Sequence, residues 1–216
     1  MSIGDLSLKE LQELEKHMPE LANFPSRLLV KNYAEFIKVL YEDIDRIIFE
    51  MQEDPGLYKS DKQEDRLTVE IKRQLSQMGY NASHDTKVGG HVDLVVRKAE
   101  YLWLGEAKVH SSYEYLWQGF QQLTTRYSTG DCNQKDGGLL IYIFANNSKT
   151  IMQKWQEYLL YKNLPNYSFE VCKIRPLAFF SSHKHEKSGE SFRVKHMPIM
   201  LYFEPQDKSG ITRKNK

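Results

Sequence analysis

The chain has 216 residues, of which 40% are hydrophobic, and its formal net charge is +1 at pH 7. This length and hydrophobic content suit one domain with a helical extension, and the near-neutral charge excludes the strongly basic class of non-specific DNA-binding proteins. The two cysteines, Cys132 and Cys172, lack CxxC or Cys/His spacing, so neither a disulfide framework nor a structural zinc site is indicated. The N-terminus has no basic leader, and no stretch approaches about 18 apolar residues, so we expect a cytoplasmic protein with no membrane partner.

Residues 7 to about 54 have the spacing of two helices, the second of them long. Its apolar positions recur at three- and four-residue steps at Leu28, Tyr33, Phe36, Leu40, Ile44, Ile47 and Met51. Pro25 separates the two helices, and Pro55-Gly56 ends the second. We therefore predict an N-terminal helical extension over residues 1–58, which either packs on the core or pairs with a second copy of the chain.

A third helix is predicted from a capping box at Ser60-Asp61-Lys62-Gln63 to about Gln77, before Gly79. Its apolar stripe consists of Leu67, Ile71, Leu75 and Met78. On a helical wheel Glu64 falls within this stripe, whereas Glu70 lies roughly 95° from its centre. Glu64 is therefore expected to face the core, although an acid in the first turn is also favoured by the helix dipole alone.

Residues 81–88 predict a rather polar strand, followed by Gly89-Gly90. The apolar runs Val92 to Val96 and Tyr101 to Val109 then flank the polar step of residues 97–100, which is typical of a hairpin of two antiparallel strands. Side chains alternate between the faces of a strand, so Glu106 and Lys108 point to the same side. Asp93 can meet both of them across the hairpin.

Two acids and an amine on one face of a hairpin suggest a metal site. Burying unpaired charge costs several kcal/mol or more, and a divalent cation would resolve the conflict. The carboxylates of Asp93 and Glu106 and the main-chain carbonyl of Ala107 are hard oxygen ligands, which suit Mg²⁺ or Mn²⁺. Lys108 would hold the attacking water or neutralise the developing negative charge. The pattern indicates phosphodiester hydrolysis, and the alternative is a plain cross-strand salt bridge on the sheet surface.

The motif itself, Asp93 followed after twelve residues by Glu106-Ala107-Lys108, resembles the PD-(D/E)XK, or restriction-endonuclease-like, nuclease superfamily. Val92 stands where the name of the family has proline. The resemblance implies an αβββαβ core with a mixed central sheet, with Asp93 and Glu106 as metal ligands and Lys108 as the catalytic lysine. It also implies an upstream glutamate that reaches the metal, for which Glu64 is favoured over Glu70.

The next helix is predicted from a cap at Ser111 or Ser112 to about Tyr127. Gln118 and Gln122 lie on the side opposite its apolar residues, where they are either solvated or offer donors and acceptors to a phosphate backbone or base edge. The resemblance implies a glutamine near the active site on this helix, so we assign substrate binding to Gln122 and Gln118. The spacing from Gln122 to Tyr127 is one residue longer than the family's commonest form, and Tyr127 is given no role.

The apolar run from Gly137 to Ala145 predicts a central strand buried on both faces, followed by a helix over residues 149–161. Strands are expected over residues 167–174 and 196–203, joined by the polar segment 181–190. His183 and His185 lie in that segment and are expected to be exposed, and with His196 they have no assigned role. The nuclease domain would then span residues 59–207, followed by a basic, disordered tail over residues 208–216.

Together these features predict a Mg²⁺-dependent (or Mn²⁺-dependent) nuclease, and a DNA endonuclease is the favoured form, although the sequence does not distinguish DNA from RNA. Such compact nucleases serve in phage defence, restriction or repair, which is an analogy of fold alone. Because no separate recognition module is visible, a homodimer or a partner protein would supply specificity. The alternative is a catalytically inactive nucleic-acid-binding or assembly subunit on the same fold.

Overall fold

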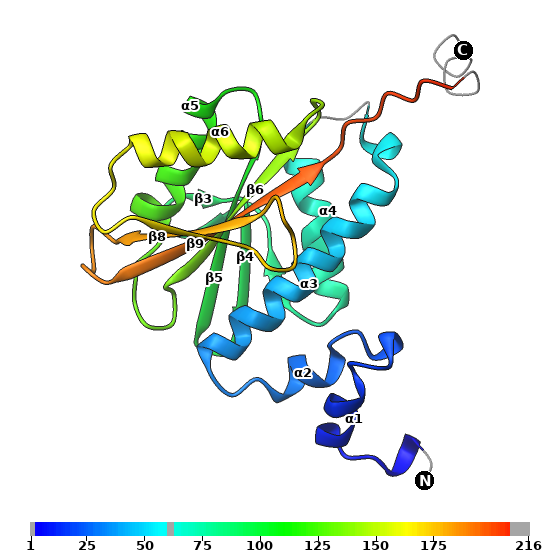
Figure 1. Ribbon diagram of the computed structural model, residues 1–216. Coiled ribbons are helices and arrows are strands. Elements are labelled where there is room, and N and C mark those ends of the chain that lie inside the picture. Colours follow the sequence, from blue (N-terminus) through cyan, green and yellow to red (C-terminus); the bar gives the residue numbers. More distant parts are fainter. Residues whose placement is uncertain (1–2, 60–62, 208–216) are drawn as a thin grey trace.

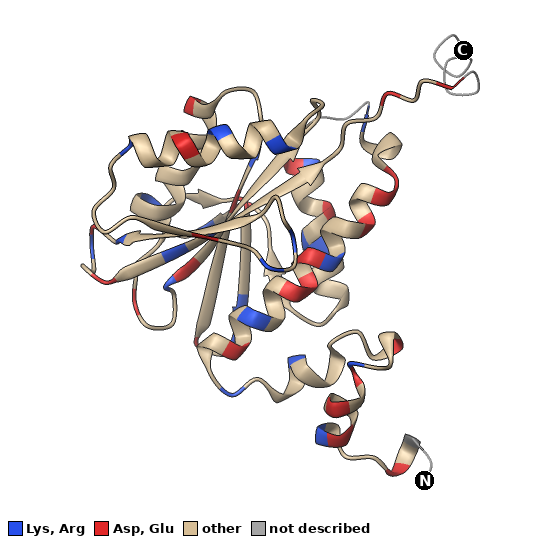
Figure 2. Ribbon diagram, in the orientation of Figure 1, with Lys and Arg blue, Asp and Glu red and all other residues tan. Residues whose placement is uncertain are grey.

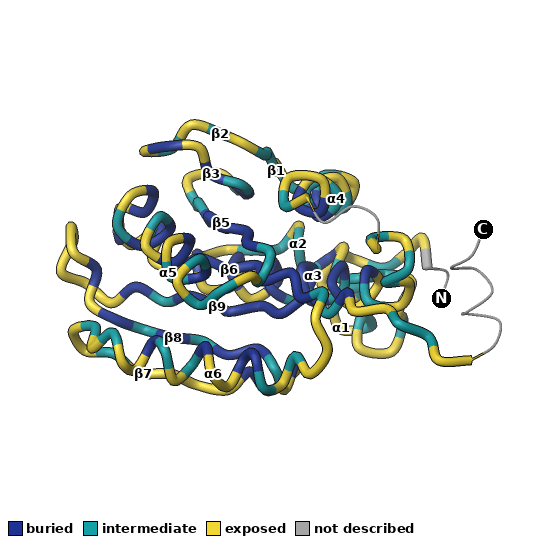
Figure 3. Tube along the Cα trace, turned by 90° about the horizontal axis from the view of Figure 1, so that it is seen from above, coloured by how far each residue is buried: buried dark blue, intermediate teal, exposed yellow. Residues whose placement is uncertain are grey.

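The computed structural model describes residues 3–59 and 63–207 of the chain. They form a mixed α/β fold in which a seven-stranded mixed sheet lies between two layers of helices (Figure 1). In a view along the layers, the central strands of the sheet are buried between helices whose outer faces are exposed, whereas the edge strand β7 is exposed (Figure 3). The predicted combination of α/β class and mixed central sheet is confirmed.

The α-helices of the described residues are α1 (Leu8–Leu14), α2 (Phe24–Leu29), α3 (Tyr33–Glu53), α4 (Glu64–Gln77), α5 (Tyr113–Gln121) and α6 (Ser148–Tyr161). Shorter helical turns are η1 (Ile3–Asp5), η2 (Pro19–Leu21), η3 (Pro55–Tyr58) and the π-helical η4 (Gln122–Tyr127). The strands are β1 (Asn81–Ser83), β2 (Thr86–Lys87), β3 (His91–Val92), β4 (Leu94–Lys98), β5 (Tyr101–Val109), β6 (Asp136–Ile143), β7 (Ser168–Val171), β8 (Phe179–Lys184) and β9 (Ser191–Met200).

The large sheet has the strand order β1-β4-β5-β6-β9-β8-β7. β5, β6 and β9 are parallel to one another, whereas the outer pairs are antiparallel. β6 lies at the centre and every one of its residues is buried, as its apolar sequence predicts. β4 and β5 form the predicted hairpin with Lys98 opposite Tyr101, so only Ala99 and Glu100 remain in the turn.

One face of the sheet is covered by α3 and α4. Phe36, Leu40 and Ile44 of α3 are almost fully buried and pack in one hydrophobic cluster with Leu140 and Met197 of the sheet. The side chain of Asn32 caps this helix by accepting a hydrogen bond from the Glu35 N–H at 3.0 Å. α3 therefore packs on the core, which is one of the two alternatives predicted for the N-terminal helices.

The other face is covered by α5 and α6. Phe120 of α5 and Trp155 of α6 pack with Leu139 and Ile141 of β6 in a second hydrophobic cluster. α5 begins after Ser112, whose hydroxyl accepts a hydrogen bond from the Tyr115 N–H at 3.1 Å, as the sequence predicts. Acidic and basic residues alternate along the exposed sides of α3 and α6, in keeping with the near-neutral charge (Figure 2).

The structure corrects two predicted elements near the N-terminal half. Pro25 does not separate two helices but lies in the first turn of α2. A backbone N–H at this position would have no hydrogen-bond partner within the helix, so proline is tolerated there. The single strand predicted over residues 81–88 is divided into β1 and β2, because Asp85 between them adopts a φ of 49°. Of the capping box predicted over residues 60–63, only Gln63 is described, as the N-cap residue of α4, and the rest lies outside the described residues.

The segment of residues 181–190 is not the exposed polar loop that the sequence predicts. Its residues 181–184 belong to β8. His183 and His185 are buried, with 5% and 0% of their surface exposed. Buried side chains of this segment meet polar partners: Ser181 Oγ of β8 lies 2.8 Å from His196 Nε2, and His185 Nε2, just after β8, lies 2.8 Å from Ser128 Oγ. The prediction of exposed histidines was therefore wrong.

Among residues 3–59 and 63–207, none of the helices has both the length and the apolar character needed to cross a membrane. The predicted basic tail over residues 208–216 lies outside the described part of the chain.

Candidate active site

The β4–β5 hairpin brings its two acids and its lysine together. Lys108 Nζ lies 2.7 Å from Glu106 Oε1 and 3.9 Å from Asp93 Oδ2, and it donates a hydrogen bond to the Ala107 carbonyl at 2.9 Å. Asp93 stands between β3 and β4, and its Oδ2 accepts a hydrogen bond from the Ala107 N–H at 2.8 Å. This bond ties the carboxylate of Asp93 to the strand that carries Glu106 and Lys108.

Glu64, in the first turn of α4, completes the cluster. Its Oε1 lies 3.9 Å from Lys108 Nζ and accepts a hydrogen bond from the Tyr115 hydroxyl at 2.7 Å, while its Oε2 accepts one from the Val109 N–H. Glu70 points elsewhere and pairs with Arg73 at 2.7 Å. Of the two upstream glutamates, Glu64 is therefore the one that the structure places beside Lys108.

Burial is graded across the four side chains. Glu106 and Lys108 are 2% and 10% exposed, whereas Asp93 and Glu64 are 26% and 24% exposed. Solvent and ions therefore reach the cluster from the side of Asp93 and Glu64, and Glu106 lies at its inner end.

Three carboxyl groups surround one lysine in a mostly buried cluster, so negative charge is in excess there. Burial, followed by the charge of Asp93, raises the pKa of Glu106 to about 7, although Lys108 opposes the change. Burial also raises the pKa of Asp93 against the opposing effect of the Ala107 N–H and Lys108. Burial alone would lower the pKa of Lys108, but attraction to Glu106, Asp93 and Glu64 outweighs it, so this pKa is raised.

The donor set fits a divalent cation. Three carboxylates and the Ala107 carbonyl are hard oxygen ligands, and Glu106 Oε2 is buried without a hydrogen-bond partner among the described residues. Such an oxygen costs stability unless a donor or a cation reaches it. No group of three or more acidic, histidine or cysteine side chains is preformed as a metal site in the described part of the chain, and Lys108 Nζ stands between the carboxylates instead.

α5 approaches the cluster closely at Gly119. A Cβ at this position would lie 2.8 Å from Lys108 Cγ and 3.2 Å from Glu106 Cγ, which is closer than side chains ordinarily tolerate. Tyr115 lies one helical turn earlier and bonds to Glu64, and burial, followed by this hydrogen bond, raises the pKa of Tyr115 to about 12. Sequence reasoning assigned no role to Tyr115 or Gly119, because neither residue belongs to the hairpin motif.

The last turn of this helical segment, η4, is a π-helix. Its hydrogen bonds run over five residues, as from the Ser128 N–H to the Leu123 carbonyl at 3.2 Å. The five-residue step from Gln122 to Tyr127 thus corresponds to one hydrogen-bonded turn, which accounts for the extra residue noted in the sequence. Tyr127 is buried, and burial, followed by the charge of Glu106, raises its pKa.

The two glutamines lie beside the cluster and not within it. They border a shallow depression of about 400 Å³ on the outer side of the helix, lined by Gln118, Gln121, Gln122, Thr125 and Arg126. Gly89 and Gly90 permit the neighbouring backbone to approach this region, since a Cβ on Gly89 would lie 2.5 Å from the Arg126 carbonyl. The structure thus brings together Glu64, Asp93, Glu106 and Lys108 and places Gln118 and Gln122 on an adjacent surface.

The buried histidines belong to the hydrophobic core. His196 accepts a hydrogen bond from Trp155 Nε1 at 3.1 Å, and its ring stacks on Phe179 at 4.2 Å between centroids. Burial lowers the pKa of His196 to about 3 and that of His183 to about 4, so both are neutral at pH 7. Both histidines are buried. Their contacts are with aromatic rings and, for His196, with Ser181, and not with the acidic cluster.

Comparisons with known proteins gave no match: no family model, no characterised protein and no solved structure was found to be similar. The interpretation of the cluster therefore depends on its own geometry and chemistry.

Proposed function

We propose that the protein is a metal-dependent nuclease that hydrolyses phosphodiester bonds in nucleic acid, with DNA as the favoured substrate and internal bonds as the favoured target. We also propose that its core is restriction-endonuclease-like. Apart from the small β2–β3 pair, which forms its own sheet, and the turn η4, the order α4, β1, β4, β5, α5, β6 supports this, because it agrees with the αβββαβ order that the motif implies. The antiparallel β4–β5 hairpin beside the parallel strand β6 also agrees with that core.

The observation that carries the proposal is the convergence of three carboxylates and a backbone carbonyl on one cation. Lys108 Nζ has Glu106 Oε1 at 2.7 Å, the Ala107 carbonyl at 2.9 Å, and Asp93 and Glu64 at 3.9 Å. A packing role does not explain this arrangement, since one ammonium leaves two negative charges uncompensated in a mostly buried place. Proteins gather desolvated acids in this way where they hold a cation or move a proton.

Each residue then has a role that follows from its place. Asp93, Glu106 and the Ala107 carbonyl would hold Mg²⁺ or Mn²⁺, with Glu64 as an accessory ligand or base. The ion would supply a water of lowered pKa and would polarise a phosphoryl oxygen. Lys108, released from the Ala107 carbonyl, would neutralise the negative charge that develops on the phosphate.

Glu64 is suited to act on the water because its carboxylate is held in place. The Tyr115 hydroxyl fixes one oxygen and the Val109 N–H fixes the other, while 24% of the side chain remains exposed. A base must keep its position relative to the proton that it removes, and two donors on one carboxylate provide this. Tyr115 therefore positions Glu64.

The surface next to the cluster offers neutral donors and acceptors with one guanidinium, that of Arg126, around the shallow depression beside Gln118 and Gln122. Such groups suit contacts to a phosphate backbone or a base edge. With a formal net charge of +1, the chain has little long-range attraction for nucleic acid. A second copy or a partner protein would therefore supply affinity and specificity, in a role such as phage defence, restriction or repair.

The test is cleavage of supercoiled plasmid DNA, and of RNA in parallel, with Mg²⁺ or Mn²⁺. Asp93→Asn and Lys108→Met should each reduce the rate by about a hundredfold or more, the usual effect of removing a ligand or an electrostatic stabiliser. The matched control is Glu70→Gln, because Glu70 is an acid of the same helix that pairs with Arg73 and not with Lys108. It should cleave at the wild-type rate.

Equal rates in the wild type and both variants would refute the proposal. A wild-type protein that cleaves neither DNA nor RNA, and whose calorimetric response to Mn²⁺ does not depend on Asp93, would favour the second candidate. In that case the protein would be an inactive nucleic-acid-binding or assembly subunit, and Lys108 would permanently occupy the place between the carboxylates.

A further inference from the structure

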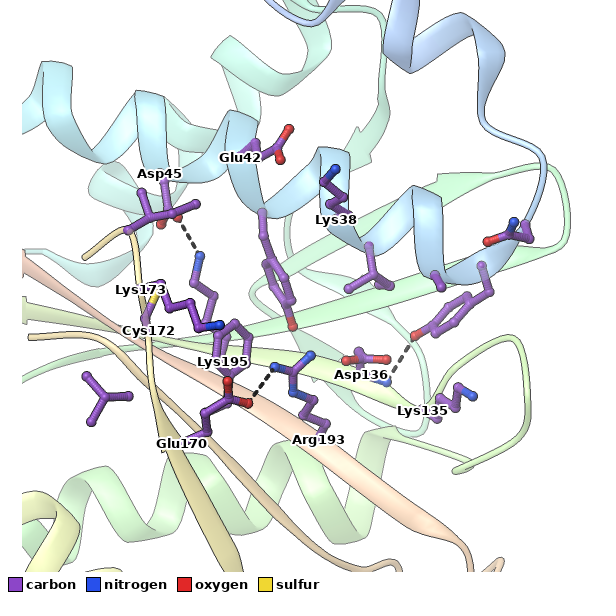
Figure 4. A pocket seen from close by; sticks show the side chains of 18 residues that line it. Lys38, Glu42, Asp45, Lys135, Asp136, Glu170, Cys172, Lys173, Arg193 and Lys195 are labelled. Carbon is purple, nitrogen blue, oxygen red and sulfur yellow. Dashed lines mark hydrogen bonds and ion pairs between the residues drawn. The ribbon is translucent and has the colours of Figure 1, made fainter. Parts of the chain in front are cut away.

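A cavity of about 590 Å³ opens between α3 and the sheet, away from the acidic cluster (Figure 4). It lies between α3, the beginning of β6, the end of β7 and the strands β8 and β9. Glu106 and Lys108 project toward α5 and Gly119, whereas this cavity is bounded by Tyr33 and Tyr41 of α3. Its size falls within the range of about 300–1,000 Å³ that is typical of small-molecule sites.

Aromatic rings form much of the cavity wall. Tyr33 and Tyr41 come from α3, and Phe180 comes from β8, with the ring of Tyr41 tilted edge-on to Phe180 at 5.8 Å. The guanidinium carbon of Arg193 lies 3.7 Å from the centroid of the Phe180 ring, and Arg193 also pairs with Glu170 at 3.7 Å. A planar ring entering here would meet aromatic faces and a guanidinium plane, both of which stack on nucleobases.

Basic side chains surround the opening. Lys38, Lys135 and Lys173 come from three separate segments and are all exposed, and within residues 3–59 and 63–207 none of them forms an ion pair. Lys195 differs, because it is buried and bonds to Asp45 at 2.6 Å. Glu42 and Asp136 partly compensate the charges of Lys38 and Lys135, but the basic residues of the lining still outnumber its acids, which favours an anion.

The cavity lining also includes a buried acid, Asp136. Asp136 is 8% exposed. Its backbone N–H donates a hydrogen bond to the Tyr33 hydroxyl at 2.9 Å, and its carboxylate takes no part in this bond. Burial raises the pKa of Asp136 to about 6, although Arg193 and Lys135 oppose the change. A carboxyl group of this kind can accept a hydrogen bond from an amino group or donate one when it is protonated.

We infer that this cavity binds a nucleotide, with the base against Tyr33, Phe180 and Arg193, a polar base edge on Asp136, and the phosphates at the lysines of the opening. The aromatic wall, the buried acid and the exposed cations offer a partner for each part of such a ligand. The inference does not depend on the proposed nuclease activity, because the cavity shares none of its lining residues with the acidic cluster.

The experiment is isothermal titration calorimetry of the full chain with ATP, GTP, CTP and UTP in the presence of EDTA. EDTA excludes divalent cations, so a nucleotide cannot be retained through a metal at the acidic cluster. Adenosine and inorganic tripolyphosphate are titrated in parallel as the ring alone and the charge alone. We expect at least one nucleotide to bind with a dissociation constant below about 1 mM, and adenosine and tripolyphosphate to bind at least tenfold more weakly.

The variant for the test is Lys38→Ala combined with Lys173→Ala, since both lysines are exposed and their loss should not disturb folding. It should weaken nucleotide binding at least tenfold. Lys154→Ala is the matched control, because Lys154 is an exposed lysine of α6 on the other face of the sheet, and it should bind as the wild type does. Absence of nucleotide binding, tripolyphosphate binding as tight as that of the nucleotides, or equal affinities in the lysine variant and the control would each overturn the inference.

Discussion

Replacing Glu106 by glutamine should stabilise the metal-free protein while removing its response to metal. The substitution keeps the shape of the side chain and removes one negative charge from the inner end of the cluster. Lys108 is not left without partners, because the Ala107 carbonyl remains at 2.9 Å and Asp93 and Glu64 remain at 3.9 Å. The change therefore relieves a desolvated charge without creating another.

The size of the effect follows from the environment of Glu106. Its pKa is raised from 4.5 to about 7, with burial as the largest cause, and each pKa unit corresponds to about 1.4 kcal/mol. At pH 8 the ionised carboxylate thus costs the folded protein about 3 kcal/mol, and this value already includes the attraction of Lys108. The cost of about 1–3 kcal/mol for an unpartnered buried oxygen, as at Glu106 Oε2, is of the same order.

The assay is thermal and urea unfolding at pH 8, in EDTA and again with Mn²⁺. In EDTA, Glu106→Gln should raise the free energy of unfolding by about 2–3 kcal/mol, or the melting temperature by about 4–12 °C for a chain of this size. Mn²⁺ should stabilise the wild type and leave the variant unchanged. Glu70→Gln should change stability by less than about 1 kcal/mol, since its pair with Arg73 is on the surface. A variant less stable than the wild type in EDTA, or stabilised equally by Mn²⁺, would refute the reasoning.

Three further predictions concern the same cluster and the histidine core. Lys108→Met should lower the metal-free stability by about 3–5 kcal/mol, because three acids then lack a cation; an unchanged urea midpoint would contradict this. Gly119→Ala places a Cβ 2.8 Å from Lys108 Cγ and should reduce cleavage at least tenfold with circular dichroism unchanged, and wild-type cleavage would show that the close approach is unimportant. Because burial lowers the pKa of His196 to about 3, the unfolded chain takes up a proton below about pH 6.5 that the folded chain does not. The stability advantage of the wild type over His196→Gln should therefore shrink by about 1.4 kcal/mol per pH unit from pH 6.5 to 4, and parallel stability curves would rule this out.

The parts of the fold that the sequence predicts well are those in which one periodic pattern decides the outcome. The β4–β5 hairpin follows from two apolar runs around a polar step, and the alternation of side chains puts Glu106 and Lys108 on one side. The all-buried strand β6 follows from an uninterrupted apolar run. The place of Glu64 follows from its position on the apolar stripe of α4, since that stripe packs on the sheet.

What the sequence does not predict depends on partners that are distant in the chain. The segment around β8 looks polar in sequence, yet Ser181 and His185 are buried because they bond to His196 and Ser128, partners that no local pattern identifies. The role of Tyr115 requires knowledge of where α5 lies relative to α4. The extra residue between Gln122 and Tyr127 is visible in the sequence, but only the structure shows that a π-helical turn absorbs it.

The cavity between α3 and the sheet could not have been predicted either. It is assembled from segments near residues 33–45, 135–136, 170–174, 180 and 193–195. In sequence, Lys38 and Lys173 are ordinary exposed lysines, and only the packing of α3 against β8 and β9 makes them neighbours of one opening.

The most direct test of the proposed cation site is diffraction from a crystal soaked in Mn²⁺, recorded where manganese scatters anomalously. We expect an anomalous peak about 2 Å from carboxylate oxygens of Asp93 and Glu106 and from the Ala107 carbonyl, with the ammonium of Lys108 moved away from that carbonyl. A soaked crystal in which Lys108 Nζ still lies 2.9 Å from the Ala107 carbonyl, with no peak among the three carboxylates, would contradict the assignment of this cluster as a metal-dependent active site.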